Sequence, residues 1–121
     1  MQTYQIIVVA DAGFVLDTVR AAWRRSGVKL SGPFRPEEVD DAELIRSGGV
    51  VIDVSLEASE LFDLSERLLQ LDVPFLFVVG SNAHSSASGL PYRLTERRAD
   101  IAAILNALSQ EHFDQTTAQL H

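Results

Sequence analysis

The sequence contains no cysteine, so disulfide bonds, thiolate metal sites and cysteine nucleophiles are excluded. Lys29 is the only lysine among ten basic residues, and seventeen acidic residues bring the formal net charge to −7. Because nucleic-acid affinity depends mainly on Lys and Arg that neutralise phosphates, this balance argues against nucleic-acid binding. Long hydrophobic runs are also absent, since no apolar segment approaches the roughly 20 residues of a membrane helix.

A secretory signal is lacking at the amino terminus, which has neither a basic start nor a small-residue cleavage site. The 121 residues, 46% hydrophobic and 22% charged, are enough for one globular domain with a sizeable core. We therefore expect a soluble, folded domain over residues 1–110, followed by a polar and frayed tail over residues 111–121. The expected location is the cytoplasm, without contact with a membrane.

Short apolar runs predict five β-strands. The most informative is the β-branched run Val50–Ile52, typical of a strand buried on both faces and closed by Asp53. The run Tyr4–Ala10 also ends at an acid, Asp11. The three remaining strands are predicted at Val28–Ser31 (broken by Gly32 and Pro33), Pro74–Val79 and Leu90–Leu94.

Apolar residues at spacings of three and four predict helices between these strands. They are expected at Phe14–Arg25, Pro36–Arg46, Ala58–Leu71 and Arg98–Leu108. The small polar segment Ser81–Gly89 predicts only a short or disordered helix. This alternation of strands and helices predicts an α/β fold, in which helices cover both faces of a parallel sheet.

Asp53 is the leading functional residue because it stands at the carboxyl end of a buried strand. In open parallel α/β sheets, ligands and reactive groups collect at that edge. A structural alternative is that Asp53 only caps the helix that follows.

Three segments of the chain resemble the response-regulator receiver domain of two-component signalling. IIVVADAG, beginning at Ile6, resembles the acidic signature of its first strand, and VVIDVSL, beginning at Val50, resembles its phosphoacceptor strand. VPFLFVVG resembles the fourth strand, with Val79 lying 26 residues after Asp53. The resemblance covers nearly the whole chain and implies a flavodoxin-like (βα)5 fold, a doubly wound parallel sheet of five strands in the order 2-1-3-4-5.

The resemblance also implies a chemistry for the acids. Asp53 would be the nucleophile that accepts a phosphoryl group from the phosphohistidine of a histidine kinase. Mg²⁺ would be held by the carboxylates of Asp11 and Asp53 and by the backbone carbonyl of Ser55. The strand order makes the first and third strands neighbours, which would bring the two acids together.

Four positions depart from the family's pattern. Ala10 stands where receivers carry a second acid, which predicts a weak Mg²⁺ site. Val79 replaces the Thr or Ser of the switch and lacks its hydroxyl. Leu94 aligns with the lysine that pairs with the phosphoryl group, and no shift of alignment restores a lysine there. Arg93 is the nearest cation, although its planar fork does not replace a compact ammonium directly.

These features predict an atypical receiver that is not an enzyme and acts as a signalling module. Asp53 would be a weak phosphoacceptor, with a histidine kinase or another signalling protein as partner and a homodimer through the fifth strand and the last helix. One alternative is a phosphorylation-competent single-domain regulator or phosphorelay intermediate. A second alternative, a flavodoxin-like module for a nucleotide or flavin, is disfavoured because ADAGF holds a single glycine and the acids would repel an anion.

Other candidate groups carry less weight. His84 lies in the Ser-rich segment and is expected to be solvated. The neighbouring serines lack the G-x-S-x-G context of a hydrolase nucleophile. The acids between Glu37 and Glu43 are expected to form a solvated face.

Overall fold

The strands of the protein form one parallel sheet with the order β2-β1-β3-β4-β5. The structure, a computed structural model, describes residues 4–80 and 92–119, with side chains through residue 109. In this part the strands are β1 (Tyr4–Val9), β2 (Val28–Phe34), β3 (Gly49–Asp53), β4 (Phe75–Gly80) and β5 (Arg93–Leu94). The predicted flavodoxin-like order is therefore confirmed, with β1 paired to β3 on one side and to β2 on the other.

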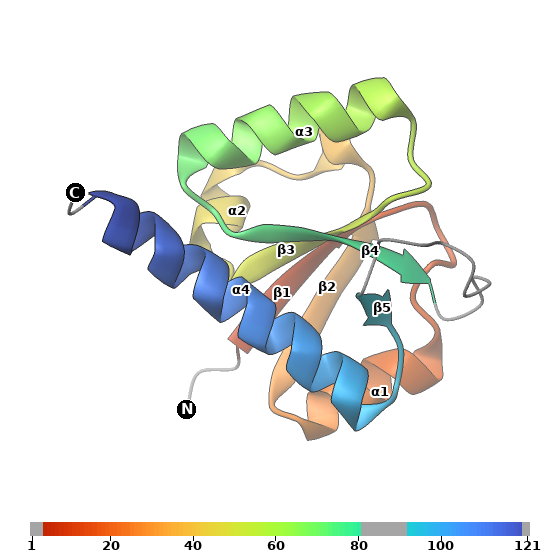
Figure 1. The fold of residues 1–121 in the computed structure, drawn as a ribbon. Helices are drawn as coiled ribbons and strands as arrows, with labels where there is room; N and C mark the ends of the chain where they lie inside the picture. The colour runs from red at the N-terminus through yellow and green to blue at the C-terminus, as the bar shows by residue number, and fades with distance from the viewer. Residues whose placement is uncertain (1–3, 81–91, 120–121) are drawn as a thin grey trace.

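Helices cover both faces of this sheet. They are α1 (Asp17–Arg25), the 3-10 helix η1 (Pro36–Glu38), α2 (Asp41–Arg46), α3 (Ala58–Leu71) and α4 (Arg98–Gln119). Figure 1 shows α2 and α3 on one face, α1 and α4 on the other, and the carboxyl-terminal part of α4 extending past the sheet. Within the described residues, no helix has both the length and the apolar composition needed to cross a bilayer.

The core divides into two layers because side chains alternate between the faces of each strand. Ile6 and Val8 of β1 belong to a buried cluster that also contains Trp23 of α1 and Ile104 of α4. Their neighbours along the strand belong to the opposite cluster, which contains Leu68 of α3. All five residues of β3 are buried, as the β-branched run predicted.

The predicted break at Gly32 and Pro33 is wrong, since β2 continues through both residues to Phe34. Gly32 makes this possible. Its φ is +112°, and a Cβ there would lie 2.6 Å from the carbonyl oxygen of Val8. The register of the pairing between β1 and β2 shifts between Ile7 and Val9, as at a β-bulge. After this shift β2 is still paired with β1 and remains in the sheet.

Two of the predicted helices also differ from the prediction. Helix α1 begins at Asp17, because Phe14 belongs to a turn in which its N–H donates to the Asp11 carbonyl. The predicted helix over residues 36–46 is split into η1 and α2, and Asp40 caps α2 by accepting from the Glu43 N–H at 2.8 Å.

The last helix is longer than predicted, since the α4 backbone continues past Leu108 to Gln119. Neither Gly nor Pro occurs after residue 91, so nothing in the sequence forces the helix to stop. The backbone of the predicted polar tail is therefore helical as far as Gln119. The predicted short helix over 81–89, and residues 90 and 91 of the predicted fifth strand, lie outside the described residues.

Candidate functional site at the carboxyl edge of the sheet

Asp53 ends β3, between neighbouring strands β1 and β4. Only 6% of the residue is exposed. The Ser55 hydroxyl lies 2.8 Å from each carboxylate oxygen, and the Ser55 N–H donates to Oδ1 at 2.9 Å. Helix α3 begins only at Ala58, with Glu57 at its N-cap. Asp53 therefore closes a local turn with Ser55 and does not cap α3, which removes the structural alternative left open by the sequence.

Asp11 lies in the loop after β1, beyond the buried Ala10. The Asp11 side chain is 67% exposed and forms an ion pair with Arg35. Arg35 also pairs with Glu60 at 2.8 Å and, more loosely, with Glu37 at 3.8 Å. The hydrogen bond that Arg35 donates to Asp11, followed by the charge of Glu60, raises the pKa of Arg35 further above its ordinary value. Oδ1 of Asp11 is thus already paired with a cation of the chain itself.

A backbone hydrogen bond links the carboxyl ends of β1 and β2, and this brings Arg35 to the carboxyl edge of the sheet. The Ala10 N–H donates to the Phe34 carbonyl at 2.9 Å, so Arg35 follows directly on the junction. Glu60 comes from the first turn of α3. The sequence interpretation missed Arg35 and Glu60. The available signal was an arginine just before the predicted helix over residues 36–46, together with an acid in the first turn of the predicted helix Ala58–Leu71.

In the structure, both carboxylates predicted to bind Mg²⁺ already have other partners. Within the described residues, no group of three or more His, Asp or Glu is close enough to hold a metal ion. Asp53 is hydrogen-bonded by Ser55, and Asp11 is paired with Arg35. Mg²⁺ prefers octahedral oxygen ligands, and this donor set does not fit it without release of Asp11.

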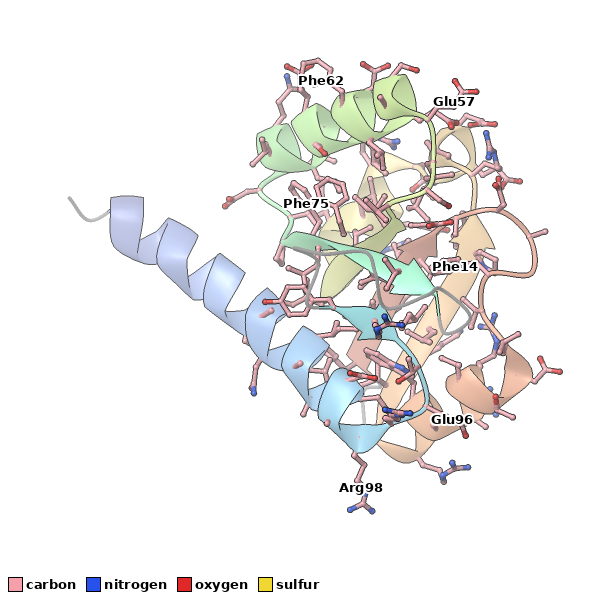
Figure 2. All side chains as sticks on the ribbon, turned by 45° about the vertical axis from the view of Figure 1, so that its right-hand side comes forward. Phe14, Glu57, Phe62, Phe75, Glu96 and Arg98 are labelled. Carbon is pink, nitrogen blue, oxygen red and sulfur yellow. The ribbon has the colours of Figure 1, made fainter. Side chains whose placement is uncertain are left out.

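The other side of the edge, around β4 and β5, is apolar. Val79 is 5% exposed and pairs in register with Arg93, while Leu94 is 2% exposed and pairs with Gly80. Leu94 belongs to the buried cluster that contains Trp23. The ring of Phe14 lies 3.2 Å from where a Cβ on Gly80 would stand, and Figure 2 shows it near the end of β4. Val79 and Leu94, the positions expected to align with the switch hydroxyl and the lysine, therefore belong to the hydrophobic core.

Thr95 connects this apolar side to α4. Its hydroxyl donates to Asp100 at 2.6 Å and accepts from the Arg97 N–H at 3.1 Å, while its carbonyl accepts from the indole of Trp23 at 3.1 Å. Arg98 points away from the domain at the same end of the helix (Figure 2). Thr95 thus fixes the start of α4 against α1.

The strand order, the two helical layers and the buried acid at the carboxyl edge define a flavodoxin-like α/β protein. The structure is similar to that of a response regulator receiver protein from Burkholderia phymatum, with a TM-score of 0.61 and 21% sequence identity. The similarity covers 88% of this chain and 95% of that chain. The chain therefore has the receiver-domain fold. No protein-family model matches the sequence, and no curated protein matches it.

Proposed function

We propose that this protein is an atypical response-regulator receiver, in which Asp53 is a weak acceptor of a phosphoryl group from the phosphohistidine of a histidine kinase. The observation that carries the proposal is the position of Asp53, 6% exposed at the carboxyl end of a central strand in a receiver fold. Reactive carboxylates of such sheets are expected at this edge.

The proposed reaction transfers one phosphoryl group. A carboxylate oxygen of Asp53 attacks phosphorus, the P–N bond to the kinase histidine breaks, and its electron pair returns to the imidazole, leaving an acyl phosphate on Asp53. Ser55 orients the carboxylate through its hydroxyl and its N–H. The attacking oxygen must give up its share of the hydroxyl bond, which slows the reaction.

The proposed output of this reaction is small. Val79 has no hydroxyl to follow the phosphoryl group, and the buried Leu94 has no charge to pair with it. Binding of Mg²⁺ would be weak, because Asp11, one of its three expected ligands, is engaged by Arg35. The proposed role is therefore that of an interaction module in signalling more than of an efficient switch.

In this proposal, partners bind through β5 and α4. The strand order places β5 at an edge of the sheet, and α4 extends past the sheet at its carboxyl end (Figure 1). A signalling protein or a second copy of the chain would use this surface. Sedimentation equilibrium of the whole protein tests the homodimer directly.

The decisive experiment measures the intact mass of the protein after incubation with a small acyl-phosphate or phosphoramidate donor. We expect slow addition of one phosphoryl group, removed by neutral hydroxylamine as an acyl phosphate should be. Asp53→Asn should abolish the addition, whereas Asp63→Asn, at an exposed position of α3, should not change it. The proposal fails if no donor or kinase modifies the wild type, or if the adduct persists in Asp53→Asn.

The same experiment separates the alternatives. Rapid, complete modification that is passed on to a second histidine would indicate a competent regulator or a phosphorelay intermediate. A coloured preparation, or a nucleotide released on denaturation, would instead indicate a flavodoxin-like binding module.

A further inference from the structure

Arg35 bridges two elements that flank the end of β3. One Nη contacts Asp11, in the loop that follows the neighbouring strand β1. The other Nη lies 2.8 Å from the carboxylate of Glu60, in the helix that follows β3. The guanidinium therefore links the loop after β1 to the first turn of α3.

The backbone around Arg35 holds it in this position. The preceding residue, Phe34, accepts the Ala10 N–H at 2.9 Å, and the Arg35 N–H donates to Glu38 Oε1 at 2.7 Å. The Arg35 side chain is 39% exposed and Glu60 is 23% exposed, so the pair is partly shielded from solvent. An arginine keeps its charge at every physiological pH, so protonation changes do not release Asp11.

We infer that Arg35 acts as an internal cation that occupies Asp11 in place of a divalent metal ion, so that removing Arg35 strengthens divalent-cation binding at Asp11 and Asp53. Two effects support this. Oδ1 of Asp11 already accepts a hydrogen bond from the guanidinium, and the positive charge of Arg35 repels an approaching cation. The inference rests on the function proposed for Asp53, but it is tested without any phosphodonor.

The test measures Mn²⁺ binding to the full-length protein from the electron paramagnetic resonance signal of free Mn²⁺. The wild type should bind weakly. Arg35→Gln should bind about tenfold more tightly, the scale expected in water when one unit charge is removed roughly 6 Å from a divalent ion. Arg25→Gln is the matched control, because it changes the net charge equally at an exposed position in the last turn of α1. It should leave binding unchanged.

A second pair of variants identifies the ligand. In Arg35→Gln/Asp11→Asn the gain should disappear, because the freed Asp11 carboxylate supplies it. The fluorescence of the fully buried Trp23 shows whether Arg35→Gln folds. If it does not fold, Arg35→Lys and Arg35→Lys/Asp11→Asn are used in its place. The gain in Mn²⁺ affinity expected in Arg35→Lys is smaller. The inference is overturned if Arg35→Gln binds Mn²⁺ no more tightly than Arg25→Gln, or if the gain survives loss of Asp11. Phosphorylation of Asp53 is judged separately, by intact mass.

Discussion

The hydroxyl of Ser55 lies 2.8 Å from both carboxylate oxygens of Asp53, so its hydrogen is shared between the two. This contact stabilises the anion in the ground state and must weaken when one oxygen attacks phosphorus. Hydrogen bonds to charged groups contribute about 1.5–3 kcal/mol. The hydrogen bond from the backbone N–H of Ser55 to Oδ1 of Asp53 does not depend on which side chain residue 55 carries.

We predict that Ser55→Ala accelerates modification of Asp53 by a small phosphodonor about three- to tenfold, since only part of that bond energy is lost on the way to the transition state. Intact mass as a function of time measures the rate. Ser59→Ala, at an exposed position of α3, is the control and should react like the wild type. A slower reaction in Ser55→Ala would show instead that the hydroxyl promotes attack.

Replacing Leu94 by lysine should destabilise the protein and should not accelerate phosphorylation of Asp53. Leu94 is 2% exposed and lies in the buried cluster that contains Trp23 and Ile101. Water could not solvate the ammonium group of a lysine at this position. We expect Leu94→Lys to lower the free energy of unfolding by more than about 3 kcal/mol, measured by urea denaturation.

Val79→Thr is the milder comparison, because it keeps the shape of the side chain and buries only a hydroxyl. Its expected cost is about 1–2 kcal/mol. If Leu94→Lys were as stable as the wild type and accelerated phosphorylation, position 94 would be an open part of the site and not core.

Gly32→Ala should be destabilising for two reasons that can be separated. The positive φ of +112° disfavours any side chain, and the added Cβ would meet the Val8 carbonyl oxygen at 2.6 Å. Gly27→Ala shares only the first reason, since its φ is +85° and nothing lies within 4 Å of a Cβ there.

We expect a loss of about 1 kcal/mol in Gly27→Ala and at least twice that in Gly32→Ala, both from urea denaturation. Equal losses would mean that the contact between β1 and β2 at Gly32 relaxes easily.

Tyr4 should make the stability of the protein depend on pH above 10. Burial raises the pKa of Tyr4 above its ordinary value of 10.0, and its hydroxyl donates to the Gly48 carbonyl at 3.0 Å. In the unfolded chain the phenol loses its proton first, so the unfolded state binds fewer protons above that pH and stability falls as pH rises.

The effect of Tyr4 should be absent at pH 8, where both states are protonated. The measurement is the urea midpoint at pH 8 and at pH 10.5. The loss between these two values should be smaller in Tyr4→Phe than in the wild type, and an equal loss would contradict the prediction.

Much of the fold could be predicted because it depends on local patterns. The apolar spacing over Ala58–Leu71 placed α3 at its observed bounds, and the β-branched run before Asp53 identified the buried central strand. Periodicity failed where a tertiary contact outweighed a local signal. Gly32 and Pro33 were expected to end β2, but the close approach to Val8 keeps the strand in the sheet.

The sequence by itself determined the alternation of strands and helices, the acid at the end of the central strand and the lack of a lysine near the carboxyl edge of the sheet. Only the tertiary structure decided how the charges at that edge are used. Arg35 lies 24 residues from Asp11 and 25 from Glu60, so no local pattern connects them. Their pairing follows from the adjacency of β2, β1 and β3. Ion pairs over such separations depend on packing, whereas helices and strands are encoded in residues that are neighbours along the chain.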